Sequence, residues 1–510
     1  MVLTSIYEVF PANLGVVYLL AIPIFAWVLL NILSGSPLYD FPAVNGKQKY
    51  EVLLTNARRR FQTQAAALIK SGFSASKNAF CMITDNGPIL VLSNKYAKEL
   101  RNDDRLSLSK FTANEFHSKI PGFEPFNVAT VEGQLMLNAI KQQLQQALDC
   151  LVVPLSAETS DALSKNWTDN PEWRELILKP SILQIVAQLS SKVFTGDDLC
   201  RNPEWHRITI TYTTHVYEAT QALFLWPKRL RPTIARFLPA CQKLRTQIEQ
   251  ARAMISAVLA KRKSEKDAAG RLSDAIDWVE ESCEGRPYDA AITQLLLSFA
   301  AIHSTADMMT QVLYDICGRE ELLSEMRQEI ISVIQDQGWT RKGLFNLKLM
   351  DSVLKEKHAH RANIASFMSV SMGRVSEDTI HLSHGVTIPK GAAVMVSSDS
   401  MWDPNEYPEP HSFDGHRFLR LRQSPEQEKY AQLVSSTPNH MGFGYGKHAC
   451  PGRFFAANEV KIALCHMLLK YDFRLTDNRP PHIVSLGFNL FTDPMAKISL
   501  RRRKEEIQLP

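Results

Sequence analysis

Paired cysteines are absent from this sequence. Its eight cysteines are scattered at positions 81, 150, 200, 241, 283, 317, 450 and 465, and none belongs to a CxxC pair. A zinc site usually draws its ligands from such pairs, so no zinc is expected. The scatter also favours reduced thiols in a cytosol-facing protein over a disulfide framework.

A strong excess of charge of one sign is also lacking. Lys and Arg total 58 against 53 Asp and Glu, and the net charge of +5 is spread over 510 residues. Without a clustered basic face, the sequence predicts no nucleic-acid partner. The short basic runs at residues 58–60 and 501–504 are expected to be solvated surface. The composition, 45% hydrophobic and 22% charged, is that of an ordinary globular protein.

No charged residue occurs between positions 14 and 33. This run matches the roughly 20 residues needed to cross a bilayer, so it predicts a transmembrane helix. A cleaved signal peptide is the alternative, but residues 1–13 contain no Lys or Arg and no AxA-like cleavage site follows. The first basic residues are Lys47 and Lys49, which places the body of the protein on the cytosolic face. We therefore expect a membrane anchor at 1–36 and the folded domain at 37–510.

Internal repeats and low-complexity linkers are missing from residues 41–510, which indicates one folded unit. Residues 125–335 show mainly helical periodicity, interrupted by prolines. Within them, residues 290–316 form a long apolar run with a polar insertion around position 304, which is typical of a buried helix. Residues 379–388 alternate around His384-Gly385 and predict a small hairpin. The expected fold is mainly α with a minor β layer.

The segment 443–456 reads FGYGKHACPGRFFA. Gly444 and Gly446 permit positive φ and close approach of the backbone to a flat ligand, and Pro451 suits the first turn of a helix. Cys450 would then lie just before a helix N-terminus, where backbone N–H groups favour the thiolate that binds metals. The plainer alternative is a core cysteine in a glycine-rich turn.

This segment resembles the haem loop of the cytochrome P-450 superfamily, FxxGxRxCxG. Phe443, Gly446, Cys450 and Gly452 fall in register, and His448 takes the arginine position, as in filamentous-fungal members of the family. The resemblance implies that Cys450 ligates haem iron, that Phe443 shields its sulfur and that His448 faces a haem propionate. It also implies a cytochrome P-450 fold, electrons from an NADPH-dependent reductase, and single-pass attachment to the endoplasmic reticulum membrane.

The family's central-helix motif, [AG]GxxT[TS], aligns with residues 300–305, which read AAIHST. The resemblance makes His303 the acid and Ser304 the alcohol that deliver protons, and Thr305 could share that role. Both residue types can transfer protons. Alternatively, Ser304 bonds to a carbonyl one turn earlier and His303 is a satisfied core residue.

A departure from the family pattern occurs in its ExxR element. Glu356 and Arg417 match two members of a buried salt-bridged triad, but the third position holds Ala359. The nearest arginine, Arg361, is displaced by about 200° around an ideal helix. Arg361 or a neighbouring histidine is expected to replace the missing guanidinium.

Three segments correspond to the family's usual substrate contacts: residues 295–302, 364–368 and 486–490. All are largely apolar, which predicts a lipophilic small-molecule substrate. Residues 193–205 resemble a stretch common in fungal terpenoid-modifying members, so a terpenoid or meroterpenoid is expected. The leading hypothesis is a monooxygenase. The alternatives are a haem-binding protein without oxygenase activity and a non-oxygenating isomerase or dehydratase.

Overall fold

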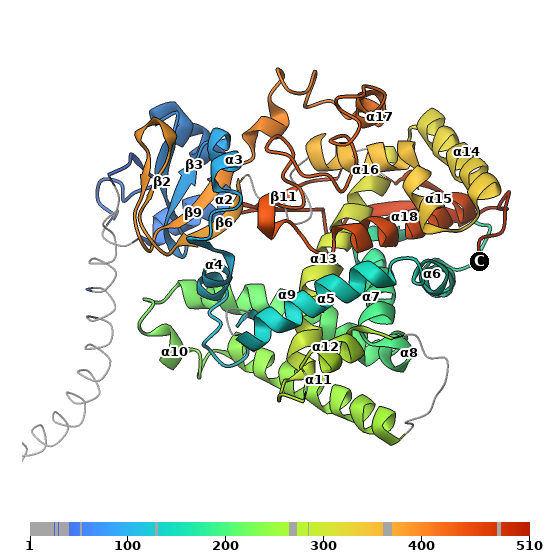
Figure 1. The fold of residues 1–510 in the computed structure, drawn as a ribbon, viewed down its shortest axis with the longest axis horizontal. Helices are drawn as coiled ribbons and strands as arrows, with labels where there is room; N and C mark the ends of the chain where they lie inside the picture. Colours follow the sequence, from blue (N-terminus) through green and yellow to red (C-terminus); the bar gives the residue numbers. More distant parts are fainter. Residues whose placement is uncertain are drawn as a thin grey trace, which may run out of the picture.

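The computed structural model describes residues 25, 29, 40–51, 54–127, 131–264, 273–283, 285–360, 370–476 and 481–510, and for residues 131–137, 139 and 357–360 the backbone alone. Helices make up most of this structure, and the main sheet lies to one side of them (Figure 1). The expected mainly α fold with a minor β layer is therefore confirmed.

The main sheet has six strands in the order β1-β2-β3-β9-β6-β4. Their bounds are Ala43–Val44 (β1), Ala79–Thr84 (β2), Gly87–Leu92 (β3), Leu106–Ser107 (β4), Val370–Ser376 (β6) and Ala393–Ser397 (β9). Strands β2 and β3 form an antiparallel hairpin, and β3 pairs with β9 in parallel. The two-residue turn of this hairpin, Asp85-Asn86, precedes Gly87 at φ +120, a conformation that glycine adopts without strain.

Helix α2 (Thr55–Ala75) packs against the hairpin. Every residue of β2 is buried, and a Cβ at Gly72 of α2 would overlap the ring of Phe80 on β2. Glycine at position 72 therefore allows the helix to lie close to the sheet. The short helices α3 (Ala97–Leu100) and α4 (Leu108–Glu115) follow, and α4 lies between the sheet and α9 (Figure 1).

The helical body surrounds one long helix, α13 (Ala290–Ile316), whose bounds match the predicted run. Asp289 caps it by accepting hydrogen bonds from the N–H groups of Ala291 and Ile292, and most of its residues are buried. Its neighbours include α7 (Leu178–Phe194), α9 (Pro203–Phe224), α11 (Pro239–Ser264), α12 (Ala275–Cys283), α14 (Glu320–Gln337), α16 (Lys348–His360) and α18 (Arg453–Lys470). The body also contains α5 (Val131–Ala147), α6 (Val152–Trp167), α15 (Arg341–Asn346) and α17 (Arg417–Arg422).

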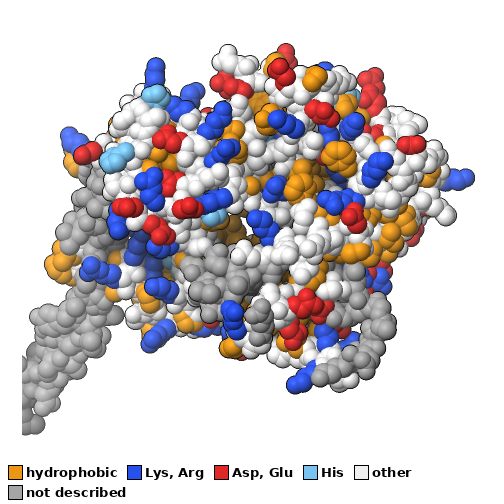
Figure 2. All heavy atoms as spheres, in the orientation of Figure 1, with side chains coloured by type: hydrophobic (Ala, Val, Ile, Leu, Met, Phe, Trp, Pro, Cys, Tyr) orange, Lys and Arg blue, Asp and Glu red, His pale blue; other side chains and the backbone are white. Residues whose placement is uncertain are grey.

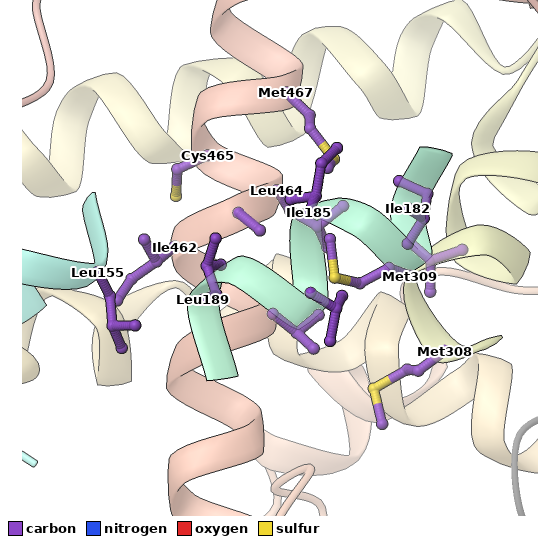
Figure 3. Close-up of a cluster of buried hydrophobic side chains, with 14 of the residues drawn as sticks. Leu155, Ile182, Ile185, Leu189, Met308, Met309, Ile462, Leu464, Cys465 and Met467 are labelled. Atoms are coloured by element: carbon purple, nitrogen blue, oxygen red, sulfur yellow. The ribbon is translucent and has the colours of Figure 1, made fainter. Parts of the chain in front are cut away.

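Apolar side chains from four helices meet in the core. Figure 3 shows Leu155 of α6, Ile185 of α7, Met309 of α13 and Leu464 of α18 in one cluster of buried residues. Burying such side chains stabilises the fold by roughly 1.5–3 kcal/mol each. Because α18 is part of this cluster, the segment immediately before it is held in a fixed position.

Prolines start helices here more often than they end them. Pro203 is the first residue of α9, and Asn202 caps that helix through the N–H groups of Glu204 and Trp205. Pro239 begins α11 and Pro180 lies in the first turn of α7. The sequence analysis expected these prolines to interrupt the helical region. In the structure they lie in the first turn of a helix, where the missing N–H of proline costs little.

The described residues also form smaller sheets. Strands β10 (Tyr471–Leu475), β13 (Lys497–Arg502) and β5 (Arg174–Ile177) form one, and β11 (Val484–Leu486) pairs with β12 (Asn489–Phe491). The predicted hairpin around His384-Gly385 is confirmed, because β7 (Ile380–His381) pairs antiparallel with β8 (Thr387–Ile388).

The predicted membrane anchor at residues 14–33 falls outside the described part of the chain, apart from Phe25 and Leu29. These two residues are helical and exposed. Within the described ranges, no helix combines the length and the apolar character that crossing a membrane requires.

Candidate active site

Cys450 lies in the loop that ends where α18 begins. Its N–H donates to the carbonyl of Phe443 at 2.7 Å, which closes the loop, and its side chain is half-buried. Burial raises the pKa of the thiol, while the backbone N–H groups of Gly452 and Arg453 act in the opposite direction. The helix start thus favours the thiolate as expected, but burial outweighs it. Metal coordination deprotonates a thiol outright.

Two glycines shape this loop. Gly444 has φ +73 and Gly446 has φ +78, as the sequence suggested. A Cβ at Gly446 would clash with the carbonyl of Arg101, the residue that follows α3. The loop is also bonded to that segment, since Arg101 Nη1 donates to the Tyr445 hydroxyl at 2.9 Å. Glycine at 446 is therefore required for the loop to dock on the α3 segment.

Phe443 and Gly452 bracket the cysteine. Phe443 is half-buried and packs against the main hydrophobic core. Gly452 caps α18 with φ -86, and a Cβ there would meet nothing within 4 Å. No described protein group requires glycine at position 452. If this position needs a glycine, as the sequence pattern predicts, the reason must be the close approach of a bound ligand.

His448 and Arg374 line the same cavity. The Nε2 atom of His448 is buried and has no hydrogen-bond partner among the described residues. Burial, with the nearby charges of Arg374 and Lys447, lowers the pKa of His448 to about 4. Arg374 on β6 is buried, and its Nη1 donates to the carbonyl of Gly373 at 2.6 Å. It has no carboxylate partner in the described ranges, and burial lowers its pKa to about 10. His448 and Arg374 thus both belong to the wall of this cavity, and neither forms an ion pair with a carboxylate among the described residues.

The cavity has a volume of about 340 Å³. Its walls come from α2, α4, α9, the β2–β3 turn, β6, the cysteine loop and the β11–β12 turn. Figure 2 shows a hollow near the middle of the molecule, where the sheet region meets the helices. Of the predicted substrate segments, residues 486–489 line the cavity and residues 364–368 lie outside the described ranges. No described residue of 295–302 lines it, although Phe299 stacks on the lining residue Tyr217.

One turn of α13 is open on one face. Ala300 is exposed and Ala301 and Ser304 are half-buried, whereas residues 305–316 are all buried. Small residues on an accessible face in the middle of a core helix leave room for a flat group. The Ser304 hydroxyl donates to the carbonyl of Ala300 at 2.9 Å, which is the local bond that the alternative interpretation anticipated.

His303 and Ser304 have different partners. The Nε2–H of His303 donates to the Ile210 carbonyl on α9 at 2.9 Å, and burial lowers the pKa of the imidazole. Thr305 is only 3% exposed. The structure therefore places Ser304 on the open face of α13 and ties His303 to α9. Sequence reasoning could not separate these two orientations.

Comparison with known proteins gives one consistent result. Residues 88–499 match the family model described as cytochrome P-450. The chain belongs to the cytochrome P-450 family.

Curated relatives cover nearly the whole chain. It is 49% identical to the cytochrome P-450 monooxygenase pyr3 of Aspergillus fumigatus, over 92% of each protein. It is 45% identical to the monooxygenase esdpI of Penicillium shearii, over 92% of this chain and 93% of that protein. It is also 45% identical to the monooxygenase adrA of Penicillium rubens, over 94% and 95%. The protein is thus a cytochrome P-450 monooxygenase.

The haem that this family implies fits the residues present. Cys450 offers the sulfur donor, and the open turn of α13 offers a flat, apolar face. The Nε2 atom of His448, which has no partner among the described residues, and the guanidinium of Arg374, which has no carboxylate partner among them, suit the two propionate carboxylates of a haem. Arg374 was missed from sequence, although it is the single charged residue of its strand.

The pair expected from the cytochrome P-450 pattern is formed. Arg417 Nε donates to Glu356 Oε2 at 2.8 Å, and both side chains are buried. Burial raises the pKa of Glu356 to about 7, although Arg417 pulls it down. Arg361 and the side chain of Ala359 lie outside the described structure, so the replacement of the third triad member stays a prediction.

Two further charged residues of α16 were not anticipated. Asp351 accepts from Lys461 of α18 at 2.6 Å and from Arg422 of α17 at 3.2 Å. Lys355 donates to the carbonyls of Tyr430, Gln432 and Ser435 at 2.7–2.9 Å. Helix α16 thus ties together α17, α18 and the chain that enters the cysteine loop.

Proposed function

We propose that this protein hydroxylates, or oxidises further, a terpenoid or meroterpenoid scaffold of fungal specialised metabolism. One oxygen atom of O2 enters a C–H bond, and the other leaves as water with two protons and two electrons. The electrons come from NADPH through a membrane-bound reductase. The observation that carries the proposal is the placement of Cys450 in a loop whose Gly444 and His448 line the 340 Å³ cavity.

The chain's residues have distinct parts in this proposal. A haem held by Cys450 supplies dioxygen activation, because electron donation from the thiolate favours O–O cleavage. Phe443 shields the sulfur, and His448 with Arg374 binds the propionates. Ser304, on the open face of α13, positions water and passes protons toward that face, with Thr305 as the neighbouring alternative and His303 as the polar residue behind it. Gly446 and Gly452 let the loop approach the haem.

The substrate proposal is supported by the lining of the cavity. Phe61, Ile89, Phe111, Val370, Met395 and Phe488 all contribute apolar surface. Apolar walls orient a ligand by shape and by a few polar groups. The resemblance of residues 193–205 to fungal terpenoid-modifying members supports a terpenoid skeleton.

The reduced, CO-bound absorption spectrum tests the thiolate ligand. The wild-type protein should show the red-shifted Soret band of a thiolate-ligated haem, and Cys450→Ser should lose both the band and turnover. Retention of turnover by Cys450→Ser would refute the assignment. Cys465→Ser, at a buried cysteine of α18, is the matched control and should keep the band.

Turnover with 18O2, NADPH and a cognate reductase tests the reaction. Incorporation of one labelled oxygen per product supports the monooxygenase. Product without label would indicate an isomerase or dehydratase, and a thiolate spectrum without NADPH consumption would indicate a haem protein that has lost the activity.

We also propose that residues 14–33 anchor the protein in the endoplasmic reticulum membrane, with the catalytic domain on the cytosolic side. The absence of charge over this run supports the proposal. Deleting residues 1–36 should move the protein from the carbonate-resistant membrane fraction to the supernatant. Persistence in the membrane fraction would show that residues 14–33 are not the anchor.

A further inference from the structure

The β11–β12 hairpin forms one wall of the cavity that the cysteine loop also lines. Its turn residues Gly487 and Phe488 and the flanking Leu486 and Asn489 all belong to the lining, and so does Gly444 of the loop. The hairpin lies where the main sheet meets the helical body (Figure 1). A ligand that extends from the cysteine loop can therefore reach this wall.

The hairpin is a small element with little support of its own. In the described part of the chain, its two three-residue strands pair only with each other. A two-stranded hairpin of this length is marginally stable by itself. Contacts with the neighbouring helices must therefore set its position.

The tip of the hairpin is attached to α2. The N–H of Gly487 donates to the carbonyl of Gln62 at 2.8 Å, and the ring of Phe488 meets that of Phe61 edge to face, with 4.8 Å between the centroids. Gly487 has φ +59, and a Cβ there would lie 2.9 Å from the ring of Phe61. These contacts fix one end of the hairpin.

The other end is attached to a buried carboxylate on α13. Thr492, the residue after β12, donates its hydroxyl to Oδ1 of Asp307. The same oxygen accepts from Nζ of Lys179 on α7 at 2.7 Å, and Lys179 also donates to the carbonyl of Thr492 at 3.5 Å. Asp307 and Thr492 are almost fully buried, and the Lys179 side chain is 12% exposed. One carboxylate therefore joins α13, α7 and the end of β12.

Aromatic contacts connect this anchored end to a second wall of the cavity. The ring of Phe491 on β12 lies 5.7 Å from Nζ of Lys179, measured to its centroid. The same ring meets that of Tyr217 at 82°, with 6.4 Å between the centroids, and Tyr217 of α9 lines the cavity. A displacement at the end of β12 would therefore move two walls.

The ion pair contributes orientation rather than stability. Apolar residues of similar volume often stabilise a core as well as a buried ion pair does. The carboxylate of Asp307, in contrast, accepts from an ammonium group and a hydroxyl in defined directions. Loss of the charge or of the hydroxyl removes a constraint that packing alone does not supply.

We infer that Asp307, paired with Lys179, is a positioning residue for substrate binding, because it fixes the β11–β12 hairpin as a wall of the cavity. Neither residue is among the described residues that line the cavity, so both act through Thr492 and the hairpin. The position of this wall determines the room that a substrate has beyond the cysteine loop. The inference rests on the proposed function and adds a determinant of its substrate selectivity.

Haem-ligating probes of different length test this inference in the full-length holoprotein. The probes are imidazole, which occupies only the space beside the haem, and 1-dodecylimidazole, whose chain extends along the cavity. Both shift the Soret band, so dissociation constants are measured without turnover. Thr492→Val keeps the shape of the side chain but removes the hydroxyl. It should weaken binding of 1-dodecylimidazole about tenfold, the effect of roughly 1.4 kcal/mol, and leave the affinity for imidazole unchanged.

Three further variants assign the effect to the anchor. Thr492→Ser restores the hydroxyl and should restore binding of 1-dodecylimidazole. Asp307→Asn removes the charge and should weaken the long probe at least as much as Thr492→Val does. Asp315→Asn is the matched control, because Asp315 is another buried carboxyl of α13, accepts from Gln311 of the same helix at 2.8 Å and is not among the described residues that line the cavity. It should leave the ratio of the two dissociation constants at the wild-type value.

Several results would overturn the inference. Wild-type binding of the long probe by Thr492→Val is one, and equal weakening of both probes is another, because it would indicate general damage to the haem site. Failure of Thr492→Ser to restore binding, or an equal loss in Asp315→Asn, would overturn it as well. Failure of the proposed function is distinguishable, because the wild-type protein would then bind both azoles but incorporate no 18O during turnover.

Discussion

The Nε atom of Arg417 lies 2.8 Å from Oε2 of Glu356, and both side chains are almost fully buried. Glu356 Oε1 accepts from the N–H of Asp414, and Arg417 Nη2 donates to the carbonyls of Glu409 and Ser412. The pair therefore joins α16 to the chain before α17 without the arginine that the family pattern has at position 359. Removing one partner of such a pair leaves a buried charge.

Arg417→Met should lower the free energy of unfolding by about 3–5 kcal/mol, because Glu356 loses its only arginine partner among the described residues. Thermal unfolding and haem content measure the effect. Arg420→Met is the control, because Arg420 lies on the same helix but is 60% exposed in its pair with Asp414, and it should change stability by less than about 1 kcal/mol. Equal losses in both variants would contradict a special role for the buried pair.

Lys355→Met should reduce haem content and destabilise the protein by about 3 kcal/mol or more. The ammonium group of Lys355 satisfies three backbone carbonyls between Tyr430 and Ser435, and methionine leaves them without that donor. Lys348→Met, at an exposed position of the same helix, serves as the control. If Lys355→Met retains wild-type haem content, the 430–435 segment is held by other contacts.

Glu459→Gln should stabilise the protein at pH 8 more than at pH 5. Glu459 is buried in α18, and burial raises the pKa of its carboxyl to about 8. The folded state then holds a proton that the unfolded state releases above about pH 4.5, so this group lowers stability as pH rises from about 4.5 to 8. The loss is on the order of 3–5 kcal/mol across that window.

Melting temperatures of both proteins at pH 5 and pH 8 measure this effect. Glutamine can still accept the hydrogen bond that Ser190 donates at 2.8 Å, so the packing is kept. The difference between the two proteins isolates Glu459 from other titrating groups. The same difference at both pH values would mean that Glu459 is not the titrating group.

Ser304→Ala should uncouple NADPH consumption from product formation and raise peroxide release, with haem content unchanged. The reason is that Ser304 lies on the open face of α13, where it can exchange its bond to Ala300 for one to water. Thr305→Ala is compared in parallel. If only Thr305→Ala uncouples the reaction, then Thr305 and not Ser304 relays the protons. If both variants stay fully coupled, neither hydroxyl relays protons.

The sequence predicted those parts of the site that depend on local patterns. Cys450 and its glycines were found because helix-start chemistry and turn chemistry act within a few residues. The bounds of α13 followed from a long apolar run with one polar insertion. The pairing of Glu356 with Arg417 followed from the family pattern.

The parts of the site that the sequence did not predict depend on contacts between residues far apart in the chain. Arg374 joins His448 at the cavity only because β6 passes beside the cysteine loop. The bonds of Lys355 span 75 to 80 residues, and the partners of Asp85 include a glutamine 136 residues away. No periodicity or spacing in the sequence encodes these placements. The different partners of His303 and Ser304 likewise depend on where α9 packs.

The docking of Gly446 against Arg101 has a consequence for recombining this protein with its relatives. The two contact segments are encoded about 345 codons apart, as shown by the bond from the Lys447 N–H to Asn102 Oδ1. A crossover placed between them inherits the loop from one parent and its docking surface from the other. Chimeras that exchange residues 101–104 together with the cysteine loop should thus retain haem more often than chimeras that split the two.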